Sequence, residues 1–163
     1  MDRDLSNYRP SKLFRAMPLE RRIDAADVFW NDDHSAEQQM EAVASIATHM
    51  KFRPRSILAL APEKRAKYLA QLPTVSDAIA ARALVGYHLE RQRPMMAAFL
   101  DQLGIAHENG LISEENVPKP DAAKIKTAVD HLSANYPAAD VSLYLATLVS
   151  QDPETWEALI DQG

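Results

Sequence analysis

Apolar residues recur every three or four positions along most of the chain, which is the spacing of a helix with one buried face. In the segment 121–136, Ile125, Val129, Leu132 and Tyr136 follow one another at spacings of four, three and four. Stretches in which apolar and polar residues alternate, as they do in half-buried strands, are missing. The pattern therefore predicts an all-α protein.

Prolines and capping residues divide this pattern into about eight helices. We predict helices over 18–30, 35–50, 62–72, 76–92, 94–103 and 121–136, one through 141–148, and a short one from residue 153. Ser35 with Gln38 fits a capping box, and Gly104 fits the residue that ends a helix. Residues 57–60 form a short apolar segment, and IAHENGLI (105–112) is predicted as an extended loop around its Asn-Gly turn.

The helical stripes also predict which side chains form the core. The predicted core residues are Ile23, Trp30, Val43, Leu69, Ile79, Leu84, Phe99, Leu100, Leu103, Ile125, Val129, Leu145 and Leu148. A chain of 163 residues with this composition predicts one globular domain over 1–163. A weak echo places residues 88–104 over 147–163, with 49–60 as a partial third copy. The helical pattern predicts a compact irregular bundle. If the echo is a true repeat, the helices form two or three stacked units that resemble a short α-solenoid.

Composition removes several classes of chemistry. The chain has no cysteine, which excludes thiolate catalysis and Cys-type zinc sites. It also lacks the phosphate-binding, dinucleotide-binding, serine-hydrolase and zinc-protease motifs, so we expect no cofactor and lean away from an enzyme. The polar start and the short apolar runs predict a soluble, cytoplasmic protein that does not enter a membrane.

Charge is distributed unevenly along the chain. Residues 51–93 hold nine basic and three acidic residues, for +6, whereas 94–163 hold three basic and eleven acidic residues, for −8. Arg53 and Arg55 flank Pro54, while Arg91 and Arg93 precede Pro94, so both pairs lie where a helix is predicted to begin. Guanidinium groups gathered there would bind a phosphate or carboxylate of a partner or ligand. Alternatively, they pair with the carboxylates of the acidic C-terminal helices. The pI near 5.5 disfavours nucleic acid.

Histidines supply two further candidates. His107 and Glu108 lie in the loop with the Asn-Gly turn, where a general acid–base pair is conceivable, although no nucleophile is near in sequence. His34 with Glu37 and Glu41 has the residue types of a metal cluster, but acids in the first turn of a helix explain the same pattern, and no metal site is predicted.

Two functions remain open from the sequence. The first is a non-enzymatic helical interaction module that binds another protein through an exposed face. The alternative is a small ligand-binding protein or enzyme that uses the arginines as an anion site together with the loop around His107. A flat or shallow exposed apolar patch would favour the first, and a deep, partly polar pocket near the arginines and His107 would favour the second.

Overall fold

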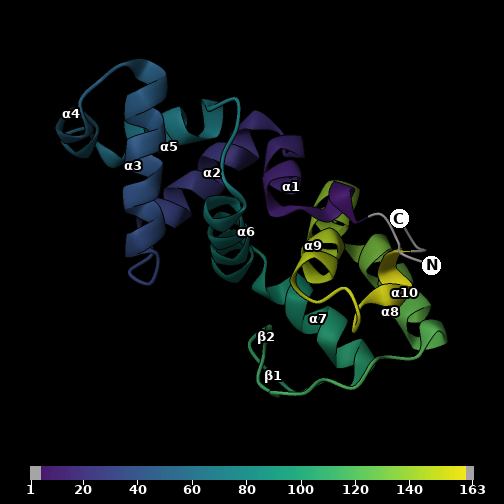
Figure 1. Ribbon diagram of the computed structural model, residues 1–163. Coiled ribbons are helices and arrows are strands. Elements are labelled where there is room, and N and C mark those ends of the chain that lie inside the picture. Colours follow the sequence, from purple (N-terminus) through teal and green to yellow (C-terminus); the bar gives the residue numbers. More distant parts are fainter. Residues whose placement is uncertain (1–4, 161–163) are drawn as a thin grey trace. The chain divides into compact units, whose positions relative to one another are not determined.

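The computed structural model describes residues 5–160 and confirms the all-α prediction. Within that range it has ten α-helices, one 3-10 helix and one hairpin of two short strands (Figure 1). Contacts between residues divide the chain into two compact units, Met1–Tyr87 and His88–Gly163. The single domain over 1–163 stays a prediction.

The described part of the first unit is built of helices, three of which begin at a proline. Its elements are η1 (Ser6–Tyr8), α1 (Pro10–Ala16), α2 (Leu19–Trp30), α3 (Ala36–Met50), α4 (Pro54–Leu58), α5 (Pro62–Gln71) and α6 (Asp77–Arg91), of which α6 extends into the second unit. Pro10, Pro54 and Pro62 occupy the first turn of their helices, where a missing N–H costs nothing. The predicted helices at 18–30, 62–72 and 76–92 are confirmed to within two residues, whereas α1 was not predicted.

The centre of the first unit is the packing of α2 against α5. Ala25, Ala26 and Phe29 of α2 and Leu69 of α5 are fully buried, and the alanines allow the two helices to approach closely. At the edge of this core, the guanidinium of Arg65 lies 5.2 Å from the centre of the Trp30 ring, a cation–π contact.

The turn between α2 and α3 corrects one predicted cap. Ser35 does precede α3, but its side chain makes no cap hydrogen bond, so the predicted capping box with Gln38 is wrong. Instead the Ser35 hydroxyl donates to Asp32 (2.6 Å), and this bond is the main reason that the pKa of Asp32 lies below its usual value. The amide of Gln39 donates to the carbonyls of Phe29 and Asp32, both at 2.9 Å. Gln39 therefore fastens the turn.

The turn between α3 and α4 contains a strained residue. Lys51 ends α3 with a φ of 59°, and the N–H of Phe52 reaches back to the carbonyl of Ala47 at 2.9 Å. This is the six-to-one bond of a Schellman motif, in which glycine is the usual residue because a Cβ in the left-handed region costs about 1–2 kcal/mol.

A substitution at Lys51 should release this strain. Lys51→Gly is expected to be more stable than Lys51→Ala by roughly 0.5–1 kcal/mol, because both remove the amine and only glycine removes the Cβ. Urea denaturation of the two variants measures the difference. Equal midpoints would show that the left-handed turn carries no strain.

The second unit contains the remaining helices and the hairpin. Its elements after α6 are α7 (Arg93–Leu103), β1 (His107–Glu108), β2 (Leu111–Ile112), α8 (Ala122–Asn135), α9 (Ala138–Gln151) and α10 (Glu157–Ile160). Phe99 of α7 stands edge-on to Tyr144 of α9, with ring centres 5.6 Å apart, and lies 5.8 Å from the ring of Trp156. All three rings are buried, and burial raises the pKa of the Tyr144 phenol.

The predicted core is largely right. Of the thirteen residues, nine are buried: Trp30, Val43, Leu69, Ile79, Leu84, Phe99, Leu100, Ile125 and Leu148. The other four, Ile23, Leu103, Val129 and Leu145, are only half-buried. On α8, Ala128 takes the central position in place of its neighbour Val129. The stripes place the buried face correctly but leave its centre uncertain by one residue.

The segment 105–112 is a second correction, because it pairs as a hairpin and not as an extended loop. His107 faces Ile112 and Glu108 faces Leu111, joined through Asn109 and Gly110 with φ values of 50° and 91°. Two residues a side are too few to hold a hairpin in isolation. This one packs on α7, where a Cβ at Gly110 would meet the Cβ of Met96 at 3.0 Å. Tertiary contact supplies what the strands lack.

The proposed internal repeat stays a prediction. In the two segments that echo each other, α7 spans eleven residues and α10 spans four, after a turn at 153–156.

Candidate functional site

The six candidate residues fall into both units. Arg53 and Arg55 belong to the first unit, and Arg91, Arg93, His107 and Glu108 to the second. Pro54 does begin α4, and Pro94 lies in the first turn of α7, as predicted for the two Arg-Pro junctions. Convergence of the four arginines on one face stays a prediction.

His107 has both ring nitrogens in hydrogen bonds within the hairpin. Nδ1 lies 3.0 Å from the backbone N–H of Gly110 and accepts its proton. Nε2 lies 2.7 Å from a carboxylate oxygen of Asp101 on α7. Because Nδ1 is an acceptor, the neutral ring carries its proton on Nε2 and donates it to Asp101. This arrangement fastens the hairpin to α7 and leaves Nδ1 no lone pair for a substrate proton.

Arg93 serves the same hairpin. Its Nη1 donates to the carbonyl of Asn109 at 2.8 Å, at the tip of the turn. Gly110 lies against the first turn of α7, and a Cβ there would come within 3.1 Å of the Arg93 carbonyl. Arg91 and Glu108 are exposed. The sequence put Arg93 and His107 in different candidate sites, whereas the structure uses both to hold the Asn-Gly turn against α7.

Removing His107 should therefore loosen the hairpin. For His107→Ala we expect a loss of about 1–2 kcal/mol in hairpin stability, because Gly110 loses its acceptor and Asp101 its donor. Hydrogen exchange of the hairpin amides measures it. Asp101→Asn is the matched control, since its amide oxygen still accepts from Nε2 and the side chain is largely exposed. Unchanged exchange in His107→Ala would contradict the structural role.

Arg53 and Arg55 lie in a different environment, which we call the α3–α4 tip: Lys51, Phe52, Arg53, Arg55 and Leu58. All five are exposed, and Phe52 and Leu58 expose 46% and 49% of their surface. Within the described part of the first unit, none of the three cationic side chains forms a hydrogen bond or an ion pair. Figure 1 shows α4 beside the C-terminal end of α3, at one end of this unit.

Sequence reasoning missed the two apolar members of the tip. The sequence predicts residues 57–60 as one apolar segment, but only Ile57 is buried. The helix α4 is so short that it packs only one side chain of this segment against α3. Phe52 follows the left-handed Lys51, which turns the chain away from the face that buries Val43 and Ile46. The signal available was an aromatic residue between two basic ones, Lys51 and Arg53.

Metal-ligating residues do not gather in the part of the chain that the structure describes. No group of three or more histidine, aspartate or glutamate side chains is placed to hold an ion there, and this includes His34, Glu37 and Glu41. His88, in the last turn of α6, is buried, and its ring centre lies 5.6 Å from that of Tyr144.

Two of the hollows in the described part of the first unit are lined by none of the six candidate residues. One, of about 110 Å³, lies between α1 and the segment 72–75. The other is a broad groove of about 480 Å³ between α3 and the same segment, with Glu41, Ser45, Thr48 and His49 among its lining residues. The candidate residues at the tip thus lie beside exposed apolar side chains and away from both hollows.

None of the helices in the described residues is both long and apolar enough to cross a bilayer. Comparison of the chain with family models, with curated proteins and with solved structures finds no match.

Proposed function

We propose that the chain is a helical interaction module that binds another protein through the α3–α4 tip. The observation that carries the proposal is the exposure of Phe52 and Leu58 beside three cations that pair with no acidic residue in the described part of their own unit. Aromatic residues and arginine are both enriched in protein interfaces, and burial of apolar side chains such as Leu58 adds to the binding energy.

Charge indicates the class of partner. Lys51, Arg53 and Arg55 lie within five residues of one another, so an approaching surface meets a concentrated positive potential. A partner segment that carries an apolar side chain flanked by aspartate or glutamate would satisfy both features. Its carboxylates would accept bidentate hydrogen bonds from the arginines, while its apolar side chain covers Phe52 and Leu58.

The alternative, a ligand site or enzyme built on the arginines and His107, has less support. His107 and Arg93 are both occupied in holding the hairpin, and neither of the two hollows described above is lined by a candidate residue. For that reason we place the interaction surface at the tip.

Capture of partners by the full chain tests this proposal. Immobilised wild type should enrich one or a few proteins, identified by mass spectrometry, and the binding segment should then be mapped and measured by calorimetry. Phe52→Ser with Leu58→Ser, and separately Arg53→Glu with Arg55→Glu, should each weaken binding by at least about tenfold.

Matched controls place the same changes elsewhere on the surface. Leu19→Ser removes an exposed leucine of α2, and Lys124→Glu with Lys126→Glu reverses two exposed charges of α8. Both controls should bind like wild type. A partner that binds tip variants and wild type alike would overturn the proposal, as would a mapped segment that is basic. Sedimentation of the protein alone shows whether a second copy takes the partner's place.

A further inference from the structure

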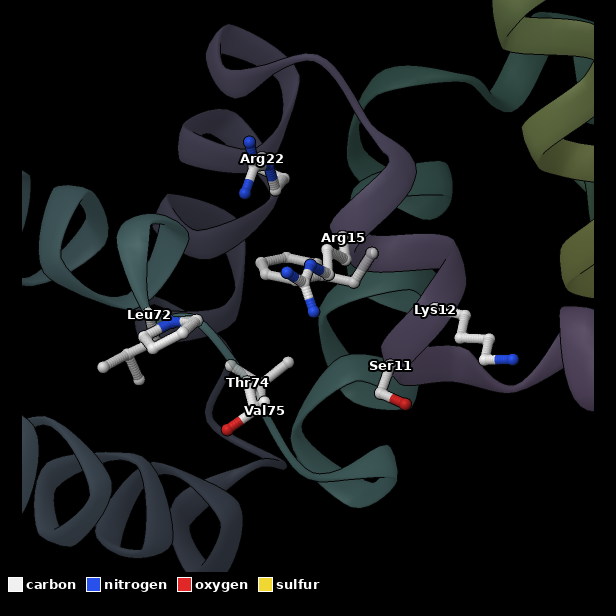
Figure 2. Close-up of a pocket in the computed structure, with 9 residues that line it drawn as sticks. Ser11, Lys12, Arg15, Arg22, Leu72, Thr74 and Val75 are labelled. Atoms are coloured by element: carbon white, nitrogen blue, oxygen red, sulfur yellow. The ribbon is translucent and has the colours of Figure 1, made fainter.

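The smaller hollow of the first unit has the chemistry of an anion site, independently of the tip. Its lining comes from α1, from Arg22 of α2 and from the segment that joins α5 to α6 (Figure 2). The lining residues are Ser11, Lys12, Phe14, Arg15, Arg22, Leu72, Pro73, Thr74 and Val75. Three of these are basic and none is acidic, although the chain as a whole carries a net charge of −5.

The basic side chains differ in how they are used. Arg22 is committed to the fold, because its Nε donates to the carbonyl of Met17 and its Nη1 to that of Ala70, both at 3.1 Å. Arg15 and Lys12 form no hydrogen bond or ion pair with any described residue. Figure 2 shows the Arg15 side chain extending from α1 toward the segment 72–75, between that segment and Arg22. Lys12 is equally free, but Figure 2 shows its amine pointing away from the segment 72–75, so Arg15 is the group placed to bind a ligand in the hollow.

The wall that carries Arg15 is held in place by a carboxylate. Asp77, the first residue of α6, accepts from the backbone N–H of Ser11 at 3.0 Å and from Arg9 at 2.9 Å. Hydrogen bonds from the side chain and backbone of Ser11, followed by that from Arg9, hold the pKa of Asp77 below its usual value. The α1 wall is thus fixed before any ligand arrives, as is usual for binding pockets.

The other part of the lining is apolar. Phe14 and Leu72 are buried, and Pro73 and Val75 continue the same surface. A volume near 110 Å³ is far below the roughly 300–1,000 Å³ of sites for larger ligands and somewhat below a cavity that holds benzene, at about 150 Å³. The occupant is therefore a group of a few heavy atoms.

We infer that this hollow binds a small carboxylate that bears a short apolar group. The planar carboxylate matches the fork of the Arg15 guanidinium, with the hydroxyl of Thr74 as a further donor in the lining, and the hydrocarbon lies on Phe14, Leu72 and Val75. Phosphate or sulfate fits less well, because a doubly charged group would lose its water against an apolar wall. The same chemistry is found in a free short-chain acid and in the C-terminal residue of a protein.

Titration of the isotope-labelled full chain by NMR tests the inference. The probes are straight-chain carboxylates from acetate to hexanoate, the primary amide of each chain length, and inorganic phosphate. We expect amide shifts confined to residues 11–15 and 72–75, dissociation constants on the order of 1 mM for the best acid, and at least tenfold weaker binding of amides and phosphate. A tripeptide with a free C-terminus, against its C-terminal amide, separates a protein terminus from a free acid.

Two variants and one control complete the test. Arg15→Gln should weaken carboxylate binding at least tenfold, and Val75→Phe, which keeps every charge, should block it by filling the hollow. Arg55→Gln removes an exposed arginine of the same unit outside the hollow and should bind like wild type. Equal affinity for phosphate and carboxylate, shifts outside the hollow, or no shifts up to about 50 mM acid would each overturn the inference.

Discussion

Leu100→Ala is expected to lower the free energy of unfolding by about 2–5 kcal/mol. Leu100 is fully buried on α7, next to Phe99, whose ring packs against Tyr144 and Trp156. Truncation removes three carbons from a packed interior, and the cost depends on how far the surrounding helices can collapse into the space. A loss below about half a kcal/mol would remove Leu100 from the core.

The two tryptophans allow this experiment to test the domain organisation as well. Trp30 lies in the first unit and Trp156 in the second, and the chain has no other tryptophan. Trp30→Phe and Trp156→Phe therefore give chains whose fluorescence reports one unit at a time. If 1–163 is one cooperative domain, Leu100→Ala should shift the urea midpoint of both reporters equally. A shift confined to Trp156 would contradict the single-domain prediction.

Most of the helices could be predicted because their signals are local. Proline at a first turn, an apolar stripe and a glycine at the end act within a few residues, and so Pro62 and Gly104 mark helix ends correctly. The segment 10–16 shows the limit: its proline and two apolar residues are too few to stand out, yet Leu13 and Phe14 are buried. This helix is stabilised by the burial of Leu13 and Phe14 in the first unit, and the sequence pattern alone does not show that burial.

The candidate site could be predicted less well, since it depends on what each side chain meets in space. The loop around His107 suggested a general acid–base role for this residue, but its hydrogen-bond partners are Gly110 and Asp101. Only the folded hairpin brings these three residues together. Anion binding by Arg53 stays a prediction, and the exposure of Phe52 beside it depends on the left-handed turn at Lys51. The hollow beside Arg15 is lined by α1 and by the segment 72–75, which lies about sixty residues further along the chain. No local sequence pattern could have predicted it.

Neighbouring substitutions in α4 should separate stability from binding. Ile57 is fully buried, while Leu58 next to it is about half exposed. Ile57→Ala should loosen α4 from α3. The loss of stability should be about 2–5 kcal/mol, or less if the free energy that holds α4 on α3 is itself smaller than that. Hydrogen exchange at Ala59 and Leu60, whose N–H groups bond to Arg55 and Ile57, measures this loosening.

Leu58→Ala is the matched change on the exposed face. It should alter stability by less than about half a kcal/mol, because its side chain already meets water, and yet weaken partner binding. Ile57→Ala should also weaken binding, although it leaves every residue of the tip in place, because a detached α4 no longer presents Arg55 and Leu58 beside Phe52. If Ile57→Ala loosens α4 while binding stays at the wild-type level, the partner does not recognise the folded tip, and a disordered basic segment would serve equally well.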